Sequence, residues 1–340
     1  MKDSRVPRPR ARRLLAPSRS RLRYALPTMA LLGALLACSE PPGESAPGGT
    51  GDSAAARSAV PGAPPVPFAD VDLAAYLDCA REQGVALLQA HRAGDRPGAA
   101  ENSLAAIAAS LADGAVFVEI DVARSADGVL VLMHDDTVDR TTNGSGRVAD
   151  MTYDELAALS LVDVDGRATG EAVPTLAAAL AALDGRGFAQ IDRKRSTSFE
   201  EIAAAVEAAG ATDRTMVITY SIDEAIALSQ RMPGVMLSTG IDSRDDIDAL
   251  RRAGVGRERV TAWLGLGSGR PDWDAQLAEL GIETSYGDFR AERNGRIDYR
   301  RMADNGAEII SVDDVPAAAG VLAAADEALR LLQACPAAQP

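Results

Sequence analysis

Short apolar runs rich in β-branched residues alternate with Ala- and Leu-rich stretches of helical period, and this alternation limits the fold more than any other feature. It is typical of repeated strand–helix units around a parallel sheet. Eight strands are expected, at residues 85–90, 116–122, 187–192, 215–219, 235–238, 260–264, 282–286 and 308–312. Helices are expected between them, for example at 103–112, 175–183, 199–209, 223–231, 272–280 and 299–305, with a last helix at 317–332. The pattern predicts an α/β protein, a TIM-type (β/α)8 barrel.

One further apolar run, residues 129–133, does not fit the repeat, because the six residues before it cannot hold a crossover helix. The pair Asp127-Gly128 indicates a two-residue β-hairpin instead. In that register Asp121 lies opposite His134, and Glu119 shares the face of Asp121. The next stretch, 135–152, is polar and is expected to be a loop inserted over the barrel mouth after the second strand.

A short helix is expected to follow that loop at residues 152–161. Thr152 and Glu155 have the spacing of a capping box at its start.

Residues 1–38 have the pattern of an export signal. Lys2 and eight arginines precede an apolar run, 24–37, that is too short to span a bilayer. The run ends in Leu-Leu-Ala-Cys38, which resembles the lipobox of bacterial lipoproteins, in which the cysteine is acylated and becomes the mature N-terminus. An ordinary secretory signal and an uncleaved anchor are the alternatives. Ser39 resembles lipoproteins sent to the outer membrane, so we expect an exported, lipid-anchored protein, at the periplasmic face of that membrane if the source has two membranes.

Three segments are expected: the signal at 1–38, a flexible Gly-, Pro-, Ala- and Ser-rich linker at 39–67, and the barrel at 68–340. Residues 1–38 hold nine of the 35 basic and one of the 49 acidic residues, so the remainder has a net charge of −22. This charge argues against nucleic acid and anionic membrane as partners. Membrane contact is expected only through the N-terminal lipid.

The two cysteines after Cys38 are Cys79, before the first strand, and Cys335, near the C-terminus. Export favours oxidation, and a closed barrel brings its two ends together. A disulfide between Cys79 and Cys335 is therefore expected, with two unpaired thiols as the alternative.

Both histidines of the chain follow expected strands, His91 after the first and His134 after the hairpin. Catalytic groups of such barrels lie at the carboxyl ends of strands, and two histidines facing one cleft can act as general acid and base. Glu119 and Asp121, at spacing two, place two carboxylates on one face of a strand, where a cation would relieve their repulsion. Asp192, at the end of the next parallel strand, is the expected third ligand.

A single lysine, Lys194, follows the signal segment and lies two residues after Asp192. A compact ammonium beside a metal is a good partner for a phosphate oxygen. Oxygen-only ligands from acidic side chains indicate one hard divalent cation, Ca²⁺ or Mg²⁺.

The order and spacing of many short motifs resemble the glycerophosphodiester phosphodiesterase family over about residues 85–316. The motifs are Ala90-His91-Arg92, Glu101-Asn102-Ser103, Val118-Glu119-Ile120-Asp121-Val122, Asp127-Gly128, Val131-Leu132-Met133-His134-Asp135, Asp139-Arg140-Thr141-Thr142-Asn143-Gly144, residues 151–159, Ile191-Asp192-Arg193-Lys194, Val217-Ile218-Thr219-Tyr220-Ser221 and residues 306–313. The resemblance implies a phospholipase-C-like barrel that hydrolyses glycerophosphodiesters, as small-molecule substrates, to glycerol 3-phosphate and an alcohol.

The resemblance also implies roles for residues at the matching positions. His91 and His134 correspond to the acid–base pair, and Arg92 and Lys194 to phosphate-binding residues. The metal ligands correspond to Glu119, Asp121 and Asp192.

Three positions depart from the family pattern. Asp192 stands where glutamate is usual, and Arg193 stands where an apolar residue is expected and needs a solvent or acidic partner. The segment 281–287 lacks the usual aromatic-Thr-Val-Asn pattern, so the alcohol pocket is expected to differ. Its candidate lining residues are Tyr153, Trp263, Tyr286 and Phe289.

Two other functions fit the same motifs. A phospholipase-type phosphodiesterase acting on lipid would need an exposed apolar rim, whereas the 135–152 loop is polar. A non-catalytic phosphodiester-binding lipoprotein would be expected to lack part of the catalytic set, and both histidines and all three acids are present.

Overall fold

The computed structural model describes residues 67–335, and within them eight parallel strands form a closed barrel. The strands are β1 (Leu87–Ala90), β2 (Phe117–Arg124), β4 (Phe188–Arg193), β5 (Thr215–Thr219), β6 (Met236–Gly240), β7 (Val260–Leu266), β8 (Glu283–Gly287) and β9 (Ile309–Val312). Each pairs with its neighbours in this order, and β1 closes the ring by pairing with both β2 and β9. The predicted TIM-type barrel and all eight strands are confirmed.

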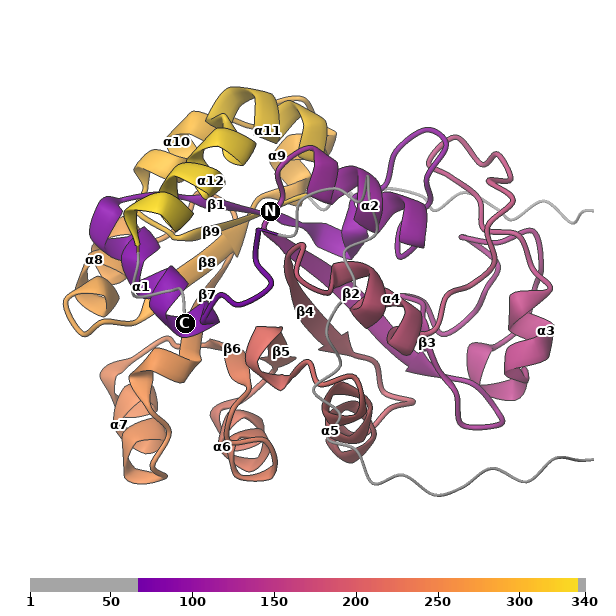
Figure 1. Ribbon diagram of the computed structural model, residues 1–340, viewed down its shortest axis with the longest axis horizontal. Coiled ribbons are helices and arrows are strands. Elements are labelled where there is room, and N and C mark those ends of the chain that lie inside the picture. Colours follow the sequence, from indigo (N-terminus) through magenta and orange to yellow (C-terminus); the bar gives the residue numbers. More distant parts are fainter. Residues whose placement is uncertain (1–66, 336–340) are drawn as a thin grey trace, which may run out of the picture. The chain divides into compact units, whose positions relative to one another are not determined.

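Helices surround the strands (Figure 1). They are α1 (Leu73–Gln83), α2 (Leu104–Ala112), α4 (Leu176–Leu183), α5 (Phe199–Ala208), α6 (Ile222–Arg231), α7 (Arg244–Arg252), α8 (Pro271–Ala278), α9 (Phe289–Arg293), α10 (Tyr299–Asp304), α11 (Val315–Leu322) and α12 (Ala324–Ala334). Many begin at a serine or threonine whose hydroxyl accepts a backbone N–H of the first turn, as Ser103 does for α2 and Ser221 for α6. Sequence-local caps thus set where the helices begin after their strands.

The expected last helix, 317–332, is wrong in one respect, because it is two helices, α11 and α12. The chain breaks at Ala323, which has a left-handed φ of 50°. The break allows α12 to pack against α1, where the Tyr76 hydroxyl donates to the carbonyl of Ala328 at 3.1 Å. Gly114, after α2, allows the start of α12 to lie close to it, since a Cβ there would lie 2.5 Å from the backbone nitrogen of Ala325.

An apolar plug fills the barrel at the amino ends of the strands. Phe117 and Phe188 lie there, with ring centroids 5.5 Å apart, and Tyr76 of α1 packs against Phe188. The disulfide between Cys79 of α1 and Cys335 after α12 joins the two ends of the barrel, with Cα atoms 6.2 Å apart. This end is therefore sealed, and the opposite end is left for a site.

The hairpin partner of β2 is β3 (Leu130–Leu132), as predicted, but its register differs by one residue. Val122 pairs with Leu132, so Asp121 lies opposite Met133 and not His134. The turn holds one residue more than a two-residue hairpin, because Gly128, at φ 90°, forms a bulge and Ser125 bonds across to Val129.

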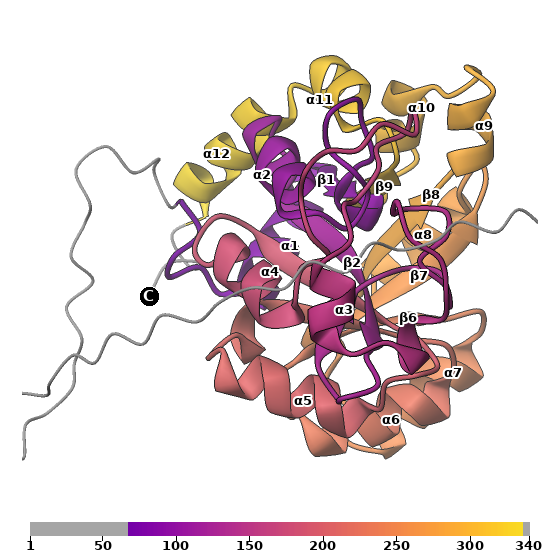
Figure 2. The same ribbon diagram turned by 90° about the vertical axis from the view of Figure 1, so that its right-hand side faces the viewer.

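The segment after β3 packs over the barrel mouth around its own small apolar cluster, which includes Val138 and Leu156. Figure 2 looks onto this end, with the helices in a ring round the strands and α3 (Tyr153–Ala157) in front. The capping box of Thr152 and Glu155 is present, although α3 is shorter than the expected 152–161.

Among residues 67–335, no helix is long and apolar enough to cross a membrane. Cys38, the signal at 1–38 and the linker residues before 67 lie outside the described residues.

Candidate active site

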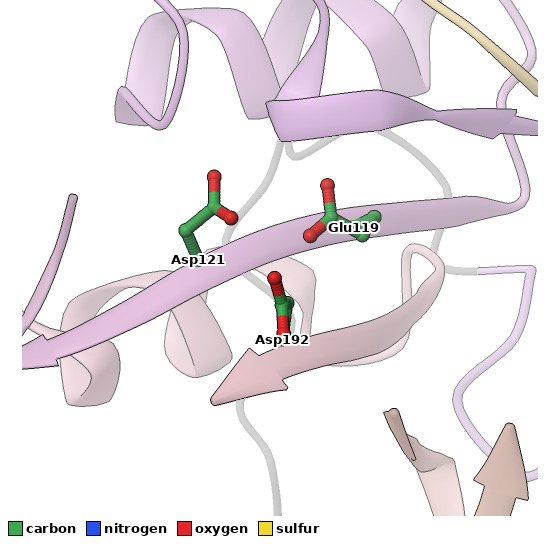
Figure 3. A group of neighbouring side chains, drawn as sticks. All are labelled: Glu119, Asp121 and Asp192. Carbon is green, nitrogen blue, oxygen red and sulfur yellow. The ribbon is translucent and has the colours of Figure 1, made fainter. Parts of the chain in front are cut away.

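Three carboxylates, two along β2 and one near the carboxyl end of β4, lie close together (Figure 3). Glu119 and Asp121 share a face of β2, and Asp121 is in register with Asp192 of β4. One oxygen from each residue lies within 4.8 Å of the others, and all three side chains are buried. Within residues 67–335, no other group of three acidic, histidine or cysteine side chains comes this close.

The electrostatics of this carboxylate cluster favour a cation. Burial and the charge of Asp121 raise the pKa of Glu119. Burial alone would raise the pKa of Asp121, but the charges of Lys194 and His134 outweigh it and lower that pKa. These buried carboxylates repel one another and offer only oxygen ligands, so the cluster fits a hard divalent ion.

Asp121 and Asp192 are oriented by neighbouring side chains. Asn102 donates its Nδ2 to Oδ2 of Asp121 at 2.6 Å and accepts the Asp121 N–H at 2.9 Å. Lys194 places Nζ 2.5 Å from Oδ1 of Asp121 and 2.6 Å from Oδ2 of Asp192. The hydroxyl of Tyr220 donates to Oδ1 of Asp192 at 2.7 Å. The expectation that Lys194 faces the same side as Asp192 is correct.

His91 follows β1 and is held on two sides. Its Nδ1 lies 2.7 Å from Oδ1 of Asp313, just after β9, and its ring stacks on Phe289 with centroids 4.0 Å apart. Burial disfavours the charged imidazole, but the hydrogen bond to Asp313 and the charge of Glu119 outweigh it and raise the pKa of His91.

His134 follows β3 and is held by a similar carboxylate. Its Nδ1 lies 2.7 Å from Oδ1 of Asp135. Arg140 donates to both Asp135 and Glu101 and lowers the pKa of Asp135 to about 2. The other ring nitrogen of His134, Nε2, lies 2.8 Å from Nη2 of Arg92.

Arg92 joins these parts of the site. Its backbone N–H donates to Oε2 of Glu119 at 2.7 Å, and its guanidinium reaches both His134 and Glu101. Arg92 and Ala93 have left-handed φ values of 52° and 64°, which ordinary side chains avoid. Such strain is frequent at functional sites, where the surrounding structure imposes it.

Two cavities meet at His91. One, of about 380 Å³, extends from the carboxylate cluster to Trp263 and Phe289, over a floor that includes Gln89 and Gln190. The other, of about 430 Å³, is charged and is lined by His91, Arg92, Asp95, Glu101, Val164, Glu292, Arg293, Asp313 and Asp314.

Two of the four expected pocket residues, Trp263 and Phe289, thus line the mouth. The other two lie elsewhere. Tyr286 is buried in the wall and donates its hydroxyl to the carbonyl of Met302, and Tyr153 packs against the apolar cluster beside α3.

Arg193 points away from the mouth, as expected. Its guanidinium donates to the carbonyl of Thr197 and to Glu224, and it lies over the ring of Phe199.

Four contacts at the site were not predicted from the sequence, those of Asn102, Asp135, Tyr220 and Asp313. Each lies within a quoted motif, but nothing in the local pattern gave it a role. Their contacts depend on tertiary proximity, as when Asp313 after β9 meets His91 after β1.

Fold and site together define a TIM-barrel protein with a buried carboxylate cluster that could hold a metal and two carboxylate-held histidines at its mouth. Residues 91–255 match the glycerophosphoryl diester phosphodiesterase family, and this segment includes both histidines and all three acids of the cluster. The chain is therefore similar to this family over just under half of its length.

Three comparisons describe the similarity. Glycerophosphodiester phosphodiesterase 1 of Rattus norvegicus is 52% identical over 71 residues, which is 21% of this chain and 21% of that protein. A glycerophosphodiester phosphodiesterase structure from Agrobacterium tumefaciens has a TM-score of 0.56 and 27% identity, over 69% of this chain and 100% of that one. A glycerophosphoryl diester phosphodiesterase structure from Parabacteroides distasonis shares the fold, with a TM-score of 0.63 and 24% identity over 73% and 86%. The chain thus matches only about a fifth of the rat protein's length.

Proposed function

We propose that this protein is a metal-dependent phosphodiesterase that hydrolyses glycerophosphodiesters to glycerol 3-phosphate and an alcohol. One observation carries the proposal: two histidines, each held at Nδ1 by an aspartate, flank one buried carboxylate cluster. Metal-assisted acid–base catalysis of phosphoryl transfer uses two such groups with a cation between them.

Glu119, Asp121 and Asp192 would hold one divalent cation, Ca²⁺ or Mg²⁺. When bound, the cation neutralises charge that develops on the phosphoryl oxygens. Asn102 and Tyr220 keep two of these carboxylates in place through their hydrogen bonds.

His134 is assigned as the base. The guanidinium of Arg92 has only donors, so its contact with Nε2 requires that nitrogen to be unprotonated. When Arg92 turns to the substrate phosphate, the lone pair of Nε2 is free to accept the proton of the attacking hydroxyl, which we take to be the substrate's own glycerol hydroxyl. This attack releases the alcohol and leaves a cyclic phosphate, which a water molecule then opens to glycerol 3-phosphate.

His91 is assigned as the acid. Its raised pKa favours the imidazolium form, and Asp313 holds Nδ1 so that the other ring nitrogen, Nε2, can donate a proton to the leaving alcohol. Phe289 fixes the plane of the ring.

Arg92 and Lys194 bind the phosphate in this proposal. Both side chains lie at the carboxylate cluster, and both are mostly buried, which strengthens charge-assisted hydrogen bonds to an oxyanion. The two cavities that share His91 offer space for the two substituents of a diester.

The location of the protein is part of the proposal. The basic segment, the apolar run and Cys38 support export and lipid anchoring, at the periplasmic face of the outer membrane in a two-membraned bacterium. The anchor would be the only membrane contact, since the mature chain is strongly acidic.

A turnover assay tests the proposal. Release of glycerol 3-phosphate is measured from glycerophosphocholine and glycerophosphoethanolamine, with Ca²⁺, Mg²⁺ or chelator, for the unsubstituted protein and for His91→Ala. Metal-dependent release that falls at least about a hundredfold in the variant supports the proposal. No release from either diester in the presence of both metals contradicts it.

A further inference from the structure

The two oxygens of Asp192 are held by donors of different charge. Oδ2 accepts from the ammonium of Lys194 at 2.6 Å, and Oδ1 accepts from the neutral hydroxyl of Tyr220 at 2.7 Å. The same ammonium lies 2.5 Å from Oδ1 of Asp121. Lys194 thus bridges two of the three carboxylates that could hold a metal ion.

An ammonium and a divalent cation compete for these oxygens. Both need the same carboxylates, which place one oxygen each within 4.8 Å of the others, and the two positive charges repel strongly in a buried site. Arg92 gives a weaker contact, with Nε 3.9 Å from Oδ2 of Asp121. Lys194 is therefore the cation in direct hydrogen-bond contact with the cluster and the one that a metal must displace.

The position of Lys194 in the chain allows this displacement. The residue follows β4, and its backbone N–H is held by the carbonyl of Val122 at 2.9 Å. Its side chain is a flexible four-carbon stem with rotatable donors, so the ammonium can move while the backbone stays in place.

Tyr220 has no charge to be repelled. Its backbone N–H donates to Glu224 at 2.9 Å, and the next residue, Ser221, caps α6. The backbone of Tyr220 is thus anchored, and its phenol, although the residue is 70% exposed, reaches Asp192 and can stay in place when a metal binds. Hydrogen bonds of this kind orient metal-ligating carboxylates, and their loss typically costs ~10-fold or more in metal affinity.

We propose that Lys194 is an exchangeable counter-ion of the carboxylate cluster: a divalent cation displaces its ammonium, which then binds the substrate phosphate, while Tyr220 holds Asp192 in its ligating orientation. The inference rests on the metal site of the proposed function. It adds an order of binding, in which the metal binds before the substrate phosphate.

Two substitutions that each remove one hydrogen bond to Asp192 should change metal affinity in opposite directions. Ca²⁺ affinity is measured by titration calorimetry on the chelator-stripped protein. Lys194→Met removes the competitor, so we expect binding about tenfold tighter. Tyr220→Phe removes the neutral clamp, so we expect binding about tenfold weaker.

Two controls separate this exchange from general effects of charge. Lys194→Arg keeps a competing cation and should bind Ca²⁺ no more tightly than the unsubstituted protein. Arg252→Met removes an exposed positive charge at the end of α7 and should leave affinity unchanged. The melting temperature of each protein in chelator, followed by circular dichroism, shows that it is folded before titration.

The outcomes are distinguishable. Tighter binding by Lys194→Met with weaker binding by Tyr220→Phe supports the exchange. Weaker binding by both variants means that both residues only support the fold of the cluster and overturns it, as does a Lys194→Met that binds with unchanged affinity. Absence of Ca²⁺ and Mg²⁺ binding by the unsubstituted protein overturns both this inference and the metal dependence of the proposed function.

Discussion

The Nδ1 atom of His91 lies 2.7 Å from Oδ1 of Asp313, so the residue after the last strand of the barrel orients the histidine after the first. Closure of the barrel through the β1–β9 pairing creates this contact, in which Ala90 is in register with Val312. The contact uses Nδ1 and leaves Nε2 of His91 free, so Nε2 is the ring nitrogen that can exchange a proton with a substrate.

Replacing Asp313 by Asn should lower the kcat of the protein and the pKa of His91. The asparagine keeps the shape but removes the charge that, with the hydrogen bond, raises this pKa. We expect kcat to fall about tenfold or more. The limb of the pH–rate profile that reports the acid should move to lower pH.

The chain has only two histidines, so NMR titration of their ring protons checks the pKa change directly. His134→Gln assigns the remaining resonance to His91. An unchanged His91 titration in Asp313→Asn would show that the contact does not tune this residue.

Metal affinity should rise with pH. Burial and Asp121 raise the pKa of Glu119, so at neutral pH and below Glu119 retains a proton that a metal must displace. Calorimetry in two buffers of different ionisation enthalpy should detect proton release on Ca²⁺ binding. In Glu119→Gln both the Ca²⁺ affinity and the proton release should be lost. A Ca²⁺ affinity of the unsubstituted protein that does not change with pH would argue against a protonated Glu119.

Stability should fall as the pH rises, and Glu308 should account for part of this fall. Burial raises the pKa of Glu308 to about 8, although its Oε2 accepts the Thr284 N–H at 2.7 Å. Between its ordinary value and about 8 the folded state binds more protons than the unfolded state, so stability decreases by up to about 1.4 kcal/mol per pH unit.

Urea unfolding of Glu308→Gln from pH 5 to 9 checks this sign. The glutamine can still accept the Thr284 N–H but does not ionise. We expect a smaller loss of stability with pH in this variant, and equal pH slopes in the two proteins would refute the assignment.

Loss of the disulfide should destabilise the barrel without altering its site. Cys79 and Cys335 enclose a loop with a sequence separation of 256, so the bond restricts the unfolded chain strongly. We expect Cys79→Ser/Cys335→Ser to lose about 2 to 4 kcal/mol of unfolding free energy and to keep its kcat. Reductant should lower the melting temperature of the unsubstituted protein towards that of the variant, and should not affect the variant itself.

The strand order could be predicted from the sequence because it depends on local patterns and on one rule of closure. Apolar runs marked all eight strands, and the short spacing before 129–133 marked the hairpin. The Cys79–Cys335 pairing, too, follows from the closed barrel that brings the chain ends together.

The register and the partners of the site residues could not be predicted in this way. The backbone of Gly128 decides between a two- and a three-residue turn, and Asp127-Gly128 suits both. Likewise, nothing local distinguishes Tyr220, which reaches Asp192, from Tyr286, which turns outward to Met302. Packing between strands that are distant in the sequence decides which way each tyrosine side chain points and which residue it contacts.

The most direct test of the proposed function is ³¹P NMR of glycerophosphocholine incubated with the protein, with Ca²⁺ or with chelator. We predict that the diester resonance is replaced by that of glycerol 3-phosphate only when the metal is present. An unchanged diester with Ca²⁺ bound, or release of phosphocholine instead, would contradict the proposed function.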